Sequence, residues 1–254
     1  MSRHLIIDGD INVYKISVSA CTELETEDGI VAVAMDRRQA ECMIDVAMAE
    51  MQDIYKAKKV SLVLSDKGPK WRNSMVDPNY KANRVKRKPI GYWKLCEYMV
   101  EKYGAISYPG LEGDDVIGIL ATDPALRKKG LYPLIISTDK DMKTLPDVEI
   151  AASLDQKPIV NSELDSWYHH MFQTLTGDSA DGYKGCRGIG KVKAEAILEG
   201  YGSLYEMWAE VVATYEGQGM TFEDALRNAR LAHILQHGEY NHETAEVKLW
   251  NPPV

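Results

Sequence analysis

Short apolar runs alternate with helical patterns over the first part of the chain. The segments "HLIID" (4–8), "VSLVLSD" (60–66) and "YPLIISTD" (132–139) are almost continuously hydrophobic, which is typical of strands covered on both faces in a parallel sheet. Residues 37–59 and 91–104 place apolar side chains at helical spacing. Strands that alternate with helices predict an α/β fold, with a mostly parallel sheet flanked by helices.

The pattern changes near residue 162. Beyond this point the strand signal disappears and helical spacing dominates, most clearly at residues 204–215 and 221–236. We therefore expect an α/β core at residues 1–162 and a smaller helical subdomain at residues 163–254.

The ends and the cysteines of the chain restrict its cellular setting. The start, "MSRHLIIDGD", reaches charged residues too early for a signal peptide, and no run of about 18 apolar residues occurs. The four cysteines are widely spaced and form no C-x-x-C pair, so neither a zinc cluster nor a disulfide framework is indicated. We expect a soluble, monomeric protein without membrane contact that acts in the cytoplasm, or in the host cytoplasm if it is viral.

Positive charge is concentrated in one stretch of an acidic chain. The formal net charge is −8, yet Lys56 to Lys94 contains twelve Lys or Arg residues and two acids. This asymmetry predicts a basic element for a polyanion, with a solvated loop as the alternative. Aromatic residues that could stack on unpaired bases are interleaved with it; they are Trp71, Tyr80, Tyr92 and Trp93.

Acidic residues follow the predicted strands. The three apolar runs end in Asp8, Asp66 and Asp139, and the carboxyl ends of parallel strands meet at one edge of a sheet, where such folds bind ligands. Further acids lie where they can join this edge: Glu112, Asp114 and Asp115 at a predicted helix start, and Asp141. Each acid alone could serve a turn or cap. As a set without nitrogen or sulfur partners, they predict Mg²⁺ or Mn²⁺.

A second motif is "TGDSADGYKGCRGIGKVK" at residues 176–193. Its glycines permit a tight turn between two short helices, which leaves N–H groups at a helix start to face a phosphate beside Lys191 and Lys193. A packing corner is the alternative. Asp178 and Asp181 have the spacing of one helix face and could bind a second ion.

Together these motifs resemble those of the flap endonuclease/5′-to-3′ exonuclease family, in the PIN-like nuclease superfamily, and especially its bacteriophage and bacterial members. The ordered set is "LIIDGD", "LVLSD", "YKANR", "LEGDDVIG", "STDKDM" and "TGDSADGYKGCRGIGKVKA". The resemblance covers most of the chain and implies a metal-dependent, structure-specific 5′ nuclease of DNA replication or repair. It implies metal ligands at Asp8, Asp66, Glu112, Asp114, Asp115, Asp139, Asp141, Asp178 and Asp181.

The resemblance also implies how DNA is held. Lys81 and Arg84 would be catalytic, from a basic helix after Pro78, and residues 67–94 would form an arch for the 5′ single strand. A helix-hairpin-helix at about residues 176–200 would grip duplex DNA, often with K⁺. The implied substrates are DNA with 5′ flaps or ends, duplex DNA and RNA–DNA hybrids. The implied DNA-binding residues are Tyr80, Lys86, Arg87, Lys88, Gly185, Gly188, Gly190, Lys191 and Lys193.

The chemistry expected of such a site is phosphodiester hydrolysis with two cations about 4 Å apart. Two other classes remain open: a non-catalytic, structure-specific DNA-binding protein, and a metal-dependent phosphatase of small phosphoesters. We interpret His169 and His170 as structural. The chain departs from the usual pattern of the family at Asp10, where a small or amide residue is common, at Gly113, where Ala is typical, and in "GYKGCRG". Whether Asp10 adds a ligand stays open at this point.

Overall fold

The computed structural model describes residues 2–25, 27–29, 31–84, 87–153 and 156–253. Its centre is a five-stranded sheet in the order β4-β1-β5-β6-β7, in which the first four strands are parallel and the last is antiparallel. The α/β fold is therefore confirmed. The strands are β1 (Ser2–Asp8), β4 (Lys59–Val63), β5 (Leu131–Ile136), β6 (Val148–Ala151) and β7 (Ile159–Asn161).

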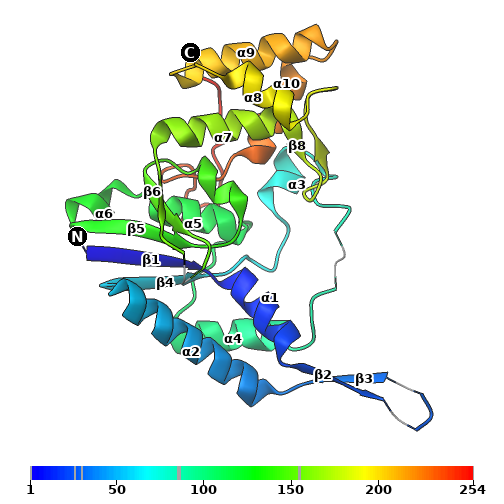
Figure 1. Ribbon diagram of the computed structural model, residues 1–254, viewed down its shortest axis with the longest axis vertical. Helices are drawn as coiled ribbons and strands as arrows, with labels where there is room; N and C mark the ends of the chain where they lie inside the picture. The colour runs from blue at the N-terminus through cyan, green and yellow to red at the C-terminus, as the bar shows by residue number, and fades with distance from the viewer. Residues whose placement is uncertain (1, 26, 30, 85–86, 154–155, 254) are drawn as a thin grey trace.

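Helices cover both faces of the sheet, which explains why successive residues at the centre of β1 are apolar. Successive residues of β1 point to opposite faces: Leu5 and Ile7 pack into one hydrophobic cluster and Ile6 into another. The first face is covered by α1 (Gly9–Ser19), α2 (Arg37–Tyr55) and α4 (Tyr92–Tyr103). The second is covered by α5 (Gly113–Ala121) and the 3₁₀ helix η1 (Lys140–Thr144), as Figure 1 shows in part.

A left-handed residue ends both of the long helices on the first face, at the predicted place in α4 but not in α2. α4 ends before Gly104, whose φ is 62°, as the sequence predicts. α2 ends at Tyr55, earlier than predicted, because Lys56 adopts a φ of 46° and β4 begins at Lys59.

Several elements were not predicted from the sequence, among them α1 and the sheet strands β6 and β7. A hairpin of β2 (Cys21–Glu25) and β3 (Val31–Met35) projects from the body (Figure 1). The short helix α6 (Pro124–Lys128) precedes β5.

The stretch between β4 and α4 differs from prediction. Its helix is the short α3 (Trp71–Met75), and residues 78–84 form successive turns instead of a basic helix. Lys81 has a φ of 58°, in the left-handed region that interrupts a right-handed helix. Lys81 and Arg84 therefore do not share a helix face.

Helices dominate after residue 162, as predicted. They are α7 (Glu163–Thr176), α8 (Lys191–Leu198), α9 (Leu204–Gly217) and α10 (Phe222–Ala232). They pack around a hydrophobic cluster of their own that includes Met171, Val211 and Tyr215, and Figure 1 shows α8, α9 and α10 gathered beyond α7. The division at residue 162 stays a prediction. Among the described residues, no helix is both long and apolar enough to cross a membrane.

The segment that joins α7 to α8 is not helical. It contains the paired strands β8 (Gly177–Asp178) and β9 (Tyr183–Lys184). Asp178 therefore lies in a strand and Asp181 in the turn that follows, so the predicted shared helix face of these two acids is wrong. The turn at 185–190 leads into α8, with the β8–β9 pair before it in place of a short helix.

Candidate active site

An acidic cavity of about 480 Å³ lies at the carboxyl edge of the parallel sheet. Asp8 ends β1, and Asp66 and Asp139 follow the ends of β4 and β5 by three residues. Because these strands are parallel neighbours, their ends bring the three acids together. The cavity is lined by five of the nine predicted metal ligands, which are Asp8, Asp66, Glu112, Asp114 and Asp139.

Asp8 is buried and Asp114 is half-buried, and both lie among other acids. Burial raises the pKa of Asp8 to about 6, and the charges of Asp10 and Asp139 add to the rise. Burial, followed by the charges of Asp139 and Asp8, holds the pKa of Asp114 well above its ordinary range. No group among the described residues donates a hydrogen bond to the Asp114 carboxylate. A buried acid without donors is stabilised by a proton or by a cation.

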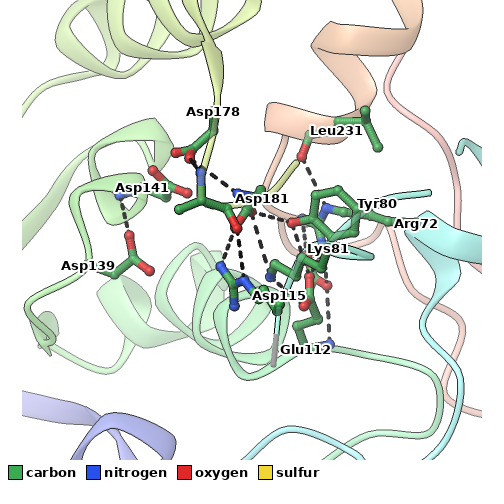
Figure 2. A network of polar contacts seen from close by, with 12 residues as sticks. Arg72, Tyr80, Lys81, Glu112, Asp115, Asp139, Asp141, Asp178, Asp181 and Leu231 are labelled. Atoms are coloured by element: carbon green, nitrogen blue, oxygen red, sulfur yellow. Dashed lines mark hydrogen bonds and ion pairs between the residues drawn. The ribbon is translucent and has the colours of Figure 1, made fainter. Parts of the chain in front are cut away.

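Cationic side chains lie against the acids at one side of the cavity (Figure 2). Lys81 Nζ donates to Glu112 Oε1 at 2.5 Å and lies 3.7 Å from Asp181 Oδ2. Arg84 donates to Asp181 Oδ1. Burial opposes charge on both Lys81 and Glu112, yet their attraction raises the pKa of the ammonium and lowers that of the carboxyl. Both groups are therefore charged at neutral pH.

A second acidic group connects η1 with β8. Lys140 Nζ donates to Asp178 Oδ2 at 2.5 Å and lies 3.7 Å from Asp141 Oδ1, and Gln173 Nε2 donates to the same Asp141 oxygen at 2.5 Å. Burial raises the pKa of Asp141 to about 6, with Asp139 adding to the rise. For Asp178 burial is outweighed by Lys140, which lowers the pKa.

These two acidic groups have the chemistry of a site for hard cations. The first group consists of Asp8, Asp66, Glu112, Asp114 and Asp139, and the second of Asp141, Asp178 and Asp181. The side chains of both groups offer only carboxylate oxygens as metal ligands, which suit Mg²⁺ or Mn²⁺. As the described side chains stand, no three His, Cys, Asp or Glu residues are placed to hold an ion. The ammonium groups of Lys81 and Lys140 lie between the acids and neutralise part of their charge.

Asp115 differs from the other acids, and the metal role predicted for it is contradicted. It is fully buried and forms a bidentate salt bridge with Arg72, in which each carboxylate oxygen lies 2.8 Å from a guanidinium nitrogen. Trp71 Nε1 donates to it at 2.8 Å and the Leu235 N–H at 3.3 Å. These donors occupy its lone pairs, so Asp115 fastens α5 to α3 and to the segment after α10.

The aromatic residues of the basic stretch are mostly internal. Trp71, Tyr80 and Tyr92 are buried, whereas Trp93 is 44% exposed at the cavity wall. The Tyr80 hydroxyl donates to Asp181 Oδ2 at 2.6 Å (Figure 2). The DNA-stacking role predicted for Tyr80 is therefore wrong, and Trp93 remains the aromatic side chain of this set that a base could reach.

The other predicted DNA contacts lie in two places. Arg87 and Lys88 are exposed near the cavity, which Lys88 helps to line; Lys86 lies outside the described residues. Lys191 and Lys193 are exposed at the start of α8.

The glycines before α8 serve different purposes. Gly188 has a φ of 73°, and a side chain at Gly190 would meet open space. Gly185, by contrast, is half-buried, and a side chain there would collide with the Leu175 carbonyl. A DNA contact is therefore open to Gly188 and Gly190, and for Gly185, which lines a neighbouring cavity with Gly188, it stays a prediction.

Several residues of the site were not recognised from the sequence. Arg72 belongs to the basic stretch in sequence but is buried against Asp115. Lys140 lies between two predicted ligands in "STDKDM", and that position was the available signal. Burial lowers the pKa of His169 to about 4 and that of His170 to about 3, which agrees with the structural role assigned to both.

Comparison with known proteins places this geometry in context. Residues 3–168 match the family model of the 5′-3′ exonuclease N-terminal resolvase-like domain. The exonuclease of Escherichia phage T7 is 30% identical, over 98% of this chain and 93% of that protein. The exodeoxyribonuclease of Enterobacteria phage T3 is 29% identical, over 98% and 92%. The structure of T5 5′-exonuclease with bound zinc ions has the same fold, with a TM-score of 0.67, 17% identity and coverage of 91% and 89%.

Proposed function

The chain belongs to the 5′-3′ exonuclease family and is a metal-dependent 5′ nuclease, and on this premise we propose that it hydrolyses DNA in the acidic cavity. The observation that carries this assignment is the meeting of Asp8, Asp114 and Asp139 at one sheet edge, directly beside Lys81 and Arg84. Acids that suit cations and cations that suit a phosphate thus share one cavity.

Mg²⁺ or Mn²⁺ would be held by the two acidic groups. Asp8, Asp114 and Asp139, with Asp66 and Glu112 beside them, would hold one ion, and Asp141, Asp178 and Asp181 another. When bound, such ions activate water and stabilise the leaving oxygen of the phosphodiester. The T5 5′-exonuclease, which carries divalent zinc ions in its structure, supports a metal at this fold's site.

Lys81 and Arg84 would neutralise the scissile phosphate. Carboxylates alone repel a phosphodiester, so cations must face it at the cavity. Lys81 Nζ donates a hydrogen bond to Glu112, and the Arg84 guanidinium donates one to Asp181. A phosphate entering the cavity offers these donors a second set of anionic oxygens. Glu112 and Asp181 would thus hold both cations in place before the substrate arrives.

Duplex DNA would lie along the start of α8. Lys191 and Lys193 are exposed there, and backbone phosphates would be contacted irrespective of sequence. The Gly188 carbonyl accepts from Lys193 Nζ at 3.0 Å, so this oxygen already faces a cation and is a candidate contact for K⁺. The 5′ single strand would pass the basic wall formed by Lys67 and Lys88. Flap specificity, cleavage of RNA–DNA hybrids and the monomeric state stay predictions.

The test is cleavage of a 5′-labelled flap, a duplex end and a chromogenic phosphoester, each with Mg²⁺, Mn²⁺ or EDTA. We expect cleavage of DNA that requires the cation and no turnover of the small ester. Asp114→Asn should nearly abolish cleavage while DNA binding survives or tightens, because the change removes both a ligand and a repelling charge. Asp53→Asn, which alters an exposed acid of α2, is the control. Full activity in EDTA, or undiminished cleavage by Asp114→Asn, would contradict the assignment.

A further inference from the structure

Asp10 lines the acidic cavity, yet the protein itself engages both oxygens of its carboxylate. Oδ2 accepts hydrogen bonds from the Ser65 backbone N–H at 2.8 Å and from the Ser65 hydroxyl at 2.5 Å. Oδ1 accepts one from the Tyr92 hydroxyl at 2.7 Å. The carboxylate therefore joins the start of α1 to the loop after β4 and to the start of α4.

Ser65 extends this connection to the helix that carries Glu112 and Asp114. Its Oγ accepts a hydrogen bond from the Gly113 N–H at 2.8 Å. Gly113 is the first residue of α5 and lies between those two acids, and Ser65 directly precedes Asp66. One short series of hydrogen bonds from Asp10 thus reaches the backbone next to three of the acids that line the cavity.

Gly113 is shaped to this contact. A Cβ at Gly113 would lie 2.9 Å from Asp10 Oδ2 and 3.5 Å from Ser65 Oγ, and the first distance is shorter than carbon and oxygen atoms normally approach. The backbone of Gly113 does not lie in the left-handed region, where glycine is favoured. An alanine at position 113 would therefore press on the Asp10 carboxylate, so Gly113 and Asp10 occupy complementary space.

The other oxygen of Asp10 fixes the basic wall of the cavity. Burial, followed by the charge of Asp10, raises the pKa of Tyr92, so its hydroxyl keeps the proton that it donates. The Tyr92 ring packs edge-to-face against the Trp93 ring, with 5.0 Å between the ring centres. Lys88 Nζ lies 4.6 Å from the Tyr92 ring centre. Lys67 Nζ lies 5.3 Å from the ring centre of Trp93.

We propose that Asp10 is a positioning residue, which holds the basic wall at a fixed place relative to the acids at the start of α5. It acts through Ser65 and Tyr92 and contributes no ligand, because its oxygens already accept three hydrogen bonds. The proposal rests on the proposed function of the cavity. Misplacement of a phosphate by about 1 Å can lower a rate a hundredfold, so the link between the two walls has a direct effect on catalysis.

The first test compares Asp10→Ala with Asp10→Asn. The asparagine keeps one oxygen for Ser65 and an amide that can donate to the Tyr92 oxygen. At saturating DNA and Mg²⁺, we expect the single-turnover rate to fall about tenfold to a hundredfold in Asp10→Ala and to recover in Asp10→Asn. Binding of DNA without divalent cations should survive or tighten in both, because each change removes one repelling charge from the cavity.

The matched control is Asp45→Ala. Asp45 also accepts hydrogen bonds from tyrosines of α4, Tyr98 and Tyr103, but it lies outside the acidic cavity. We expect this variant to lose stability in urea and to keep its cleavage rate. If Asp10→Ala behaves in the same way, Asp10 is merely structural and the proposal is overturned.

The second test needs no catalysis. In a double-mutant cycle, Gly113→Ala should lower the urea midpoint of the parent, and should lower it less or even raise it in the Asp10→Ala background, where the new methyl group has room. Additive effects would overturn the contact. If the unmutated protein shows no nuclease activity, the proposed function is refuted. The double-mutant cycle still tests the contact between Asp10 and Gly113 in that case, because it measures stability and not cleavage. Should Asp10→Ala not fold, Tyr92→Phe removes one hydroxyl, and an unchanged rate there would overturn the proposal.

Discussion

Replacing Asp8 by asparagine should change how the stability of the metal-free protein depends on pH. Asp8 is buried at the end of β1 and its pKa is raised from 3.8 to about 6, first by burial and then by neighbouring acids. The folded state therefore holds the proton of Asp8 more tightly than the unfolded state does. As the pH rises from about 4 to about 6, the unfolded chain loses this proton first, and the contribution of Asp8 to stability falls.

The size of this change follows from the two pKa values. A rise from 3.8 to about 6 corresponds to about 3 kcal/mol of unfolding free energy. The effect is absent below about pH 4, where both states are protonated, and complete above about pH 6. Asp8→Asn cannot ionise, while its amide can still contact Ser137, the residue that donates to Asp8 at 2.8 Å.

The assay is urea unfolding of the parent and of Asp8→Asn in EDTA, followed by tryptophan fluorescence from about pH 4 to about pH 8. We expect the unfolding free energy of the variant, relative to that of the parent, to increase by about 3 kcal/mol from the lower to the upper end of this pH range. Acids that Asp8 does not influence, such as Asp178 and Glu112, contribute equally to both proteins, so the difference reports Asp8 together with its effect on Asp114. Excess Mg²⁺ should stabilise the parent more than the variant above about pH 6. A difference that stays constant with pH would refute the burial of Asp8 among acids.

Three further predictions concern neighbouring residues. Asp114→Asn should stabilise the metal-free protein at neutral pH, whereas Asp115→Asn should destabilise it by about 3 kcal/mol or more, because it breaks a buried ion pair. Urea unfolding in EDTA measures both changes in unfolding free energy, and two changes of the same sign would contradict the roles assigned to these acids. Lys81→Ala should lower the single-turnover rate at saturating DNA on the order of a hundredfold, while Lys88→Ala should mainly weaken binding. If both variants lose the same rate and both recover it at high DNA concentration, Lys81 contributes only to the general positive charge. Gly190→Val, which meets no clash, should weaken salt-sensitive binding of duplex DNA without unfolding the chain, and unchanged affinity would make the turn a packing corner.

Much of the fold could be predicted because burial on two faces leaves a strong pattern. The central residues of strands β1, β4 and β5 are mostly apolar, and the ends of these strands place Asp8, Asp66 and Asp139 at one edge. The turns after Pro78 could not be predicted in the same way. Lys81 donates its backbone N–H to the Asp181 carbonyl at 2.7 Å, so a contact distant in sequence, with a left-handed φ, outweighs the local helical tendency.

The sequence also could not separate a metal ligand from the acid of an internal ion pair. Asp114 and Asp115 are adjacent, but α5 turns the first toward Asp8 and Asp139 and the second toward Arg72. Only the partners, which come from distant segments, distinguish them. Asp10 and Gly113 illustrate the converse: two departures from the usual family pattern, far apart in the chain, prove to be neighbours in space.

The ion pair of Arg72 and Asp115 bears on the moment at which a newly synthesised chain becomes competent. A nascent chain that has reached Gly200 already contains every acid of the two groups. The guanidinium, however, donates to the carbonyls of Leu231 and His233, at 3.2 and 2.6 Å (Figure 2 shows Leu231). Until residues 231–233 have left the ribosome, the buried Arg72 guanidinium lacks two of its hydrogen-bond acceptors, which is costly. We therefore expect the Arg72–Asp115 pair, and with it the start of α5 that carries Glu112 and Asp114, to reach its full set of contacts only once the chain has been made past His233.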